Sequence, residues 1–403
     1  MAPVLSLLST LTLLSTVIHS VHGYNINDPK QLLRRDGEVD TSEQLLPFID
    51  YEAISEAADI AVSEELQRRG LLDAEEVNAK RSNSPRCSKI NVRKEWRKLS
   101  TSEKKSYIKA VKCLTTKSDF GISTYSDKMY DAFTYIHEQN WFLFHGCATF
   151  PVWHRWFVWL REVTMREQCG YTGPFPYWNY TMDWKDPFAS PIFSSDSETG
   201  FGSHGNVAVA EIAGATGYKV DNGAFANFRV NLPEPHFLTR NFTFWKESDP
   251  TGQYGKAFGK WFGPEQLQKT LAANTFWDFE KLMDGLEAPQ SLGIHNGPHF
   301  NQNGDWSGPA WLVNNPTYYP WRSTAPNDPM FFPHHAYVDA VFWQWQQRPG
   351  KQYLYGGSTD IFNLTKNDAK ITDMLPFSGF GPDVPVALTL KTESFPLCYT
   401  YDV

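Results

Sequence analysis

The chain has 403 residues, of which 41% are hydrophobic and 15% aromatic, and its 37 basic and 45 acidic side chains give a formal net charge of −8. This length allows a substantial buried core, and 15 Trp with 28 Phe exclude a largely disordered protein. The acidic balance and the lack of a Lys/Arg run argue against a nucleic-acid partner, because such proteins neutralise phosphates with a basic excess.

The first 23 residues have the pattern of a secretory signal. Residues 1–23 contain no Asp, Glu, Lys or Arg, and their apolar run from Val4 to Ile18 is short for a membrane span. Val21 and Gly23 are suitable for cleavage before Tyr24. The segment therefore predicts secretion without stable membrane association, and a retained membrane anchor is the alternative.

Residues 24–81 form an acidic segment with fourteen acidic and seven basic side chains. It accounts for almost the whole net charge, so the remaining chain is close to neutral. Dibasic pairs, typical of processing sites, stand at 34–35, 68–69 and 80–81. We expect a propeptide here, which could cover an active-site mouth. The alternative is an acidic helical arm, because residues 52–72 have an amphipathic pattern.

Residues 82–403 carry every Trp and Cys and are expected to form one catalytic domain. Helical spacing begins at 91–111, where Ser100 or Thr101 is placed to cap a second helix that starts near Glu103. Residues 186–260, rich in Gly, Ser, Asn and Pro, predict long loops. The other predicted helices are 128–145, 152–169, 264–284 and 328–347. The expected fold is mainly α with little β.

Histidines gather in two parts of this domain. The first group is His137, His145 and His154, and the second is His295, His299, His334 and His335. Four-residue spacing in the second group places two rings on one helix face, one turn apart. A single histidine beside aromatic residues is usually a hydrogen-bonded core residue, but so many together indicate metal binding. Three neutral imidazoles without a thiolate or carboxylate suit copper or zinc.

Other metal sites fit the sequence less well. A zinc protease would need Glu within H-E-x-x-H, but Asn296 and Gly297 follow His295. A di-iron carboxylate site would need Glu-x-x-His pairs, whereas Glu138 is directly next to His137. No C-x-x-C-H for covalent haem is present.

Two longer patterns resemble a known family, the type-3 copper proteins of the tyrosinase and polyphenol oxidase class, in their short secreted fungal form. The first pattern, H-x7-H-G-x3-F-P-x-W-H-R-x6-E, covers residues 137–162, and the second, H-N-x2-H followed by N-D-P-x-F-x2-H-H-x3-D, covers 295–339. Arg93 near the start and Tyr399-Thr400-Tyr401 near the end match the family's boundary marks. The resemblance extends over about residues 87–403.

This resemblance implies an antiparallel four-helix bundle that encloses a pair of copper ions. His137, His145 and His154 would hold the first ion, and His295, His299 and His335 the second. His334 is the alternative sixth ligand. Asp339, one turn after His335, is expected to be a hydrogen-bond acceptor for the site. His204 and His236 lie in loop sequence and are expected at the surface.

The implied activity is O2-dependent oxidation of catechols to o-quinones, with phenolic small molecules as substrates, in pigment or secondary-metabolite formation. Hydroxylation of monophenols would also need a proton acceptor, for which the resemblance points to Asn296 and a water-orienting carboxylate, here Glu287. Phe300 is expected to narrow the pocket mouth and to disfavour charged substrates. The alternatives are a non-catalytic dioxygen carrier and a structural or zinc-binding secreted protein.

The five cysteines leave at least one thiol without an intramolecular partner. Secretion favours disulfides among Cys87, Cys113, Cys169 and Cys398, and Cys87 with Cys398 could join the two ends of the domain. Cys147 is then the free thiol.

Overall fold

A computed structural model describes residues 46–81, 85–211, 217–242, 257–288, 291–307 and 324–403. The proposed signal segment 1–23 and the dibasic pair 34–35 lie outside these residues. No helix among the described residues combines the length and apolarity needed to cross a bilayer.

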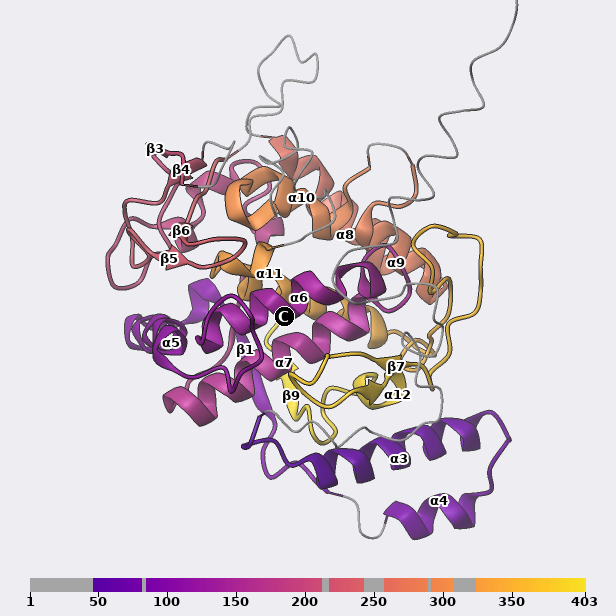
Figure 1. Cartoon of the computed structure of the whole chain (residues 1–403). Helices are drawn as coiled ribbons and strands as arrows, with labels where there is room; N and C mark the ends of the chain where they lie inside the picture. The colour runs from indigo at the N-terminus through magenta and orange to yellow at the C-terminus, as the bar shows by residue number, and fades with distance from the viewer. Residues whose placement is uncertain (1–45, 82–84, 212–216, 243–256, 289–290, 308–323) are drawn as a thin grey trace, which may run out of the picture. The chain divides into compact units, whose positions relative to one another are not determined.

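Helices dominate the fold, as the sequence predicts, and the four predicted helical regions after residue 111 are present with small changes (Figure 1). Region 264–284 is two helices rather than one, because the chain turns at Ala273 and Thr275 caps the second by accepting the Asp278 amide. The helices that concern the site are α6 (Met129–Phe144), α7 (Phe150–Cys169), α8 (Pro264–Ala272), α9 (Phe276–Asp284), α10 (Gly293–Gln302) and α11 (Phe331–Gln346).

The expectation of a helix from residue 91 is wrong in its first part. Residues Asn91–Glu95 form strand β1, and a short 3-10 turn, Trp96–Lys98, separates it from α5 (Thr101–Cys113). The expected cap is confirmed, because Ser100 and Glu103 exchange both hydrogen bonds of a capping box. β1 is a strand because it pairs with segments far along the chain, which local periodicity cannot show.

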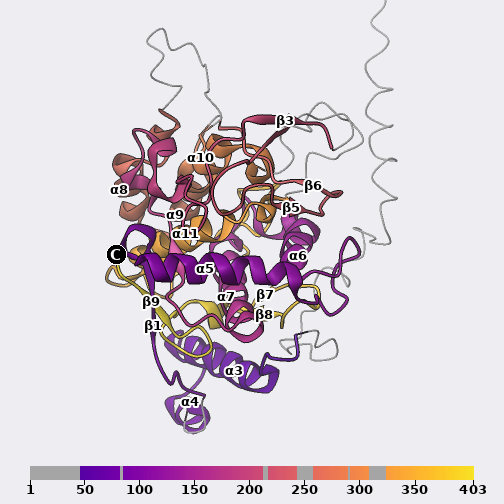
Figure 2. The ribbon, with the colours of Figure 1, turned by 90° about the vertical axis from the view of Figure 1, so that its left-hand side faces the viewer.

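The two ends of the domain meet in a small parallel sheet of order β2-β1-β9. β1 pairs with β9 (Tyr399–Tyr401) and with β2 (Pro176–Tyr177), and Figure 2 shows β1 beside β9. The Cys87–Cys398 disulfide joins the same two ends, and Cys113–Cys169 joins α5 to α7. Both disulfides and the free, buried Cys147 confirm the cysteine assignment.

Region 186–260 is mostly loop, as expected, but its described part contains short antiparallel pairs. These strands are β3 (Val207–Val209) with β4 (Gly217–Lys219), and β5 (Arg229–Val230) with β6 (His236–Phe237). A further pair near the C-terminus is β7 (Met374–Leu375) with β8 (Val384–Pro385).

The acidic segment contains two helices, α3 (Tyr51–Arg68) and α4 (Ala74–Arg81). Ile54, Ala57 and other apolar side chains of α3 are buried in the main core, and the Arg68 guanidinium lies 3.6 Å from the centre of the Tyr353 ring. α3 packs against α12 (Val386–Thr389) and β8, neither of which carries a histidine. These contacts fit the alternative of a helical arm.

Candidate metal centre

The first histidine group is assembled where α6 ends and α7 begins. His137 lies on α6, His145 directly follows the last residue of α6, and His154 lies on α7. Their ring centroids are between 5.0 and 5.6 Å apart. One ring nitrogen of each lies within 4.8 Å of those of the others, close enough to hold one metal ion.

The second group combines α10 with the start of α11. His295 and His299, one turn apart on α10, have ring centroids 4.8 Å apart. His334 and His335 are consecutive residues of α11, and candidate ligand atoms of all four histidines lie within 4.8 Å of one another. All four are buried.

Backbone carbonyls orient the rings of the first group. Nδ1 of His145 contacts the Trp141 carbonyl oxygen at 2.9 Å, and Nδ1 of His154 contacts the Phe150 carbonyl oxygen at 2.9 Å. A carbonyl oxygen only accepts, so each Nδ1 carries the hydrogen and each Nε2 keeps its lone pair. Helical geometry alone achieves this, since each carbonyl lies one turn before its histidine.

Partners from outside the helix orient the rings of the second group. His299 Nδ1 donates to the Trp306 carbonyl oxygen at 2.7 Å, and His295 Nδ1 contacts the Asp284 carboxylate at 2.5 Å. Such contacts fix the tautomer and strengthen the other nitrogen as a ligand. Among the described residues, the buried Nε2 atoms of His154 and His295 have no hydrogen-bond partner. Lone pairs buried in this way fit a metal ion.

Burial also favours the neutral form of four of these imidazoles. Burial, with the neighbouring rings, lowers the pKa of His145 to about 3 and holds the pKa values of His154, His299 and His335 well below the ordinary range. Only the neutral ring binds a metal, so the group is ready for metal at neutral pH.

The two histidine groups face each other. The rings of His154 and His335 are stacked with centroids 4.3 Å apart, and those of His145 and His295 are 6.0 Å apart. The structure therefore offers two adjacent metal positions rather than two independent ones.

Comparison with known proteins agrees with this geometry. Residues 127–348 match the common central domain of tyrosinase. The chain belongs to the tyrosinase family. It is 33% identical over 327 residues to the tyrosinase-like protein phomQ2 of Diaporthe leptostromiformis, covering 79% of this chain and 75% of that protein. It is also 33% identical over 325 residues to tyrosinase ustQ of Aspergillus flavus, covering 79% and 81%.

Among solved structures, a mutant polyphenol oxidase from Thermothelomyces thermophila superposes with a TM-score of 0.62 at 25% identity. The match covers 88% of this chain and 99% of that one. Tyrosinases are type-3 dicopper proteins, and the two histidine groups supply a position for each copper ion. The chain is therefore a copper oxidoreductase.

Both members of the His334-His335 pair lie near the second metal position of this tyrosinase. His335 Nε2 lies 3.3 Å from His299 Nε2, and the His335 ring stacks on His154 of the first group. His334 contacts His295 and His299, and it also packs against the rings of Tyr180 and Trp306. These contacts link His335 to both groups and His334 to the second group.

The carboxylate that contacts a histidine of the tyrosinase site is Asp284, whereas the sequence suggested Glu287. Glu287 pairs with Lys269 at 2.9 Å, and its side chain is 29% exposed. The buried carboxylate is Asp284, which contacts His295 and accepts the Gly146 amide at 2.9 Å. Asn296 donates its amide to the Asp284 backbone oxygen at 2.8 Å.

A tight glycine turn places Asp284 there. Gly285 and Gly293 have φ values of +73° and +61°, and a Cβ on Gly293 would lie 2.4 Å from the Met283 carbonyl oxygen. The end of α9 is therefore pressed against the start of α10. The sequence signal was the Asp-Gly pair at the helix end, which by itself indicates only a C-cap.

The expectation for the remaining histidines is half correct. His204 is partly exposed, but His236 is 1% exposed and contacts Asp305 at 2.8 Å. His236 is buried because the β5–β6 hairpin packs it against the segment after α10, which loop composition does not show. Phe300, expected at the pocket mouth, is 46% exposed.

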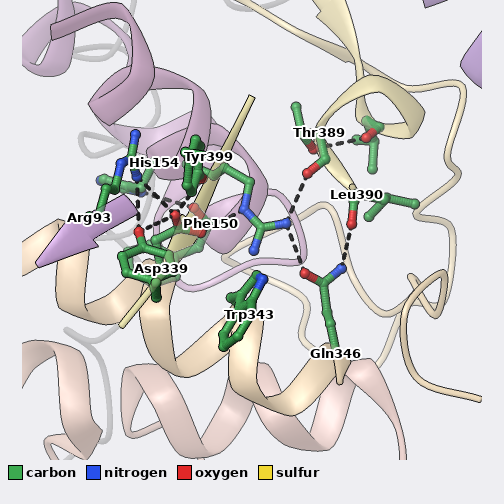
Figure 3. A network of polar contacts seen from close by, with 12 residues as sticks. Arg93, Phe150, His154, Asp339, Trp343, Gln346, Thr389, Leu390 and Tyr399 are labelled. Carbon is green, nitrogen blue, oxygen red and sulfur yellow. Dashed lines mark hydrogen bonds and ion pairs between the residues drawn. The ribbon is translucent and has the colours of Figure 1, made fainter. Parts of the chain in front are cut away.

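Asp339 does not accept from His335, contrary to expectation. Its carboxylate accepts instead from the guanidinium groups of Arg93 at 3.2 Å and Arg155 at 2.6 Å, and from the hydroxyls of Tyr399 and Tyr401, each at 2.5 Å (Figure 3). With four donors, the carboxylate has no capacity left for the imidazole. This network joins β1 and β9 to α7 and α11, two helices that carry site histidines.

Proposed function

We propose that the protein is a secreted phenol oxidase that uses O2 to oxidise catechols to o-quinones and also hydroxylates monophenols, in the formation of a pigment or a phenolic secondary metabolite. The observation that carries this proposal is the convergence of the two histidine groups, in which the ring of His154 stacks on that of His335 with centroids 4.3 Å apart. The copper pair, when bound, supplies the two-electron exchange with O2. We propose His137, His145, His154, His295, His299 and His335 as its ligands.

The chain's own residues would keep the site dry and shaped for an aromatic ring. Phe150 lies 4.3 Å from the His295 ring, and Phe331 lies 4.1 Å from the His335 ring, measured between centroids. Phe300 exposes an apolar ring directly after His299. Such surroundings favour neutral phenols, because no positive side chain follows His299 to attract a carboxylate.

Monophenol hydroxylation would need a proton acceptor. We propose that Asn296 positions this step: its NH2 group is engaged by the Asp284 backbone oxygen, so its amide oxygen remains as an acceptor. Asp284 fixes both residues, because its carboxylate contacts His295 and its backbone oxygen accepts the Asn296 amide. The same proposal includes a secretion signal at residues 1–23, and a segment at 24–81 that is either a propeptide or a helical arm that stays on the domain.

Oxygen uptake by the copper-loaded chain tests this function. With 4-tert-butylcatechol and 4-tert-butylphenol, we expect uptake on both, with a lag on the monophenol. Uptake with the catechol alone would remove the hydroxylase assignment. Bound copper without uptake on either would contradict the enzyme assignment and favour the dioxygen carrier.

Two substitutions separate the candidates for the proton-handling step. Glu287→Gln is expected to leave the ratio of monophenol to catechol rates within about twofold, because the Glu287 carboxylate is paired with Lys269. Asn296→Ala is expected to lower that ratio by at least about tenfold, because groups that accept or donate the transferred proton typically contribute about 10²–10⁴-fold. The measurement is initial O2 uptake on both substrates, with copper content as the control. A tenfold drop in Glu287→Gln would return the role to Glu287.

A further inference from the structure

A buried ion pair lies next to the segment that contacts the second histidine group. His236, on β6, places Nε2 2.8 Å from an Asp305 carboxylate oxygen and Nδ1 2.7 Å from the Glu234 carbonyl oxygen. Both side chains are nearly inaccessible, at 1% and 2% exposure. None of the motifs that identify the family includes either residue.

The geometry defines the charge of this pair. Asp305 also accepts the Thr239 amide and hydroxyl, at 2.7 and 2.8 Å, and the Asn327 amide at 3.2 Å, so its oxygens act as acceptors throughout. Both nitrogens of His236 thus face acceptors, and each must carry a hydrogen. The pair is an imidazolium and a carboxylate, a charge-assisted contact shielded from water.

Asp305 directly precedes Trp306, whose carbonyl oxygen contacts the proposed copper ligand His299. It lies in the short 3-10 segment Gly304–Ser307 after α10, where the chain turns back at Asn303 and Gly304, both with positive φ. This return brings the Trp306 carbonyl to 2.7 Å from His299 Nδ1. The contacts of Asp305 with β6 and with Asn327, just before α11, hold the returning segment in place.

We propose that the His236–Asp305 ion pair positions His299, by holding the Trp306 carbonyl on its Nδ1 and so aiming Nε2 at the second metal position. His236 and Asp305 are positioning residues, since neither touches the metal site. The inference rests on the proposed role of His299 as a ligand. Without His236, Asp305 is a buried charge lacking its cation, and the segment that carries Trp306 is free to shift.

The test measures release of copper rather than activity. The copper-loaded chain is mixed with a Cu(I) chelator and a reductant, and release is followed by absorbance. In His236→Gln we expect one of the two ions to leave faster than in the parent, by up to about 10–100-fold, the loss when the direct hydrogen-bond partner of a ligating histidine is removed. The other ion should leave at the parent rate. Asp305→Asn, a milder change, should accelerate the same ion.

His204→Gln is the matched control. His204 is a partly buried histidine of the same region that accepts the Phe242 amide at 3.0 Å and has no contact with Asp305 in the described structure. Both ions should leave this variant at the parent rate. Parent-like release of both ions from His236→Gln, with only a lower melting temperature, would show a merely structural role and overturn the inference.

His299→Asn distinguishes this failure from a failure of the proposed ligands. If His299→Asn binds one ion fewer and His236→Gln releases copper normally, only the positioning inference is wrong. If His299→Asn keeps both ions, the ligand assignment is wrong.

The pH dependence of the unmodified chain gives a second readout. Burial lowers the pKa of His236, but Asp305 and its hydrogen bond, the Glu234 carbonyl and Glu211 together raise it above its ordinary value. Glu211 is itself paired with Arg229. The contribution of the pair is complete below about pH 6.5, the ordinary histidine pKa, and is lost as pH rises through the raised value.

Copper release from the second position should therefore accelerate on the alkaline side. Protonation of ligand histidines has the opposite sign, since it promotes release as pH falls. His236→Gln should lack the alkaline acceleration, and its persistence in that variant would contradict the proposal.

Discussion

His335→Asn is expected to lower copper from two ions per chain to one and to abolish O2 uptake on catechol, whereas His334→Asn should keep both ions. The Nε2 atoms of His335 and His299 are 3.3 Å apart, as two ligands of one ion require, and the His335 ring also stacks on His154. An amide side chain is shorter and a weaker ligand, so the second position would retain only His295 and His299.

The two variants form a matched pair, because they are adjacent, equally buried and carry the same substitution. Copper content by elemental analysis is the primary measurement, and circular dichroism of the metal-free proteins checks that both fold. The ring of His334 packs against Trp306 and Tyr180, so its loss should lower the melting temperature while the copper content stays unchanged. If His334→Asn lost an ion and His335→Asn kept both, His334 rather than His335 would be the sixth ligand.

The sequence was most informative where function depends on local spacing. Aromatic periodicity predicted α6, α7 and α11 closely, because each is buried along most of its length and needs no distant partner to define it. The histidines followed from the same spacing, since His295 and His299 share a face of α10. The structure brings all the predicted metal ligands together.

The sequence was least informative where a residue's role depends on distant segments. β1 is a strand because β2 and β9, both far along the chain, pair with it. Asp284 and Glu287 are equivalent by composition, and only the Gly285 turn decides which carboxylate reaches His295. His236 is in loop-like sequence, yet its partner Asp305 lies 69 residues further along the chain. Such contacts cannot be obtained from local spacing.

Asp339→Asn is expected to reduce the free energy of unfolding of the metal-free chain by about 3–5 kcal/mol, the cost of removing one partner from a buried ion network. The Arg93 and Arg155 side chains are fully buried, and Asp339 is shared by both. A neutral amide leaves Arg155 without its ionic partner, although Gln346 and the Thr389 carbonyl still accept from it. Arg93 retains Glu162, so the damage should be greatest between α7 and α11.

Denaturant unfolding measures this effect, with two variants as a graded series. Tyr399→Phe removes one of the four donors and keeps both charges paired, so it should cost about 1–3 kcal/mol. Glu198→Gln breaks an exposed ion pair with Lys105 and should cause no measurable change. Equal losses in Asp339→Asn and Tyr399→Phe would mean that the hydroxyls rather than the charges stabilise the network. Because α7 and α11 carry His154 and His335, Asp339→Asn should also bind copper less tightly, whereas Glu198→Gln should not.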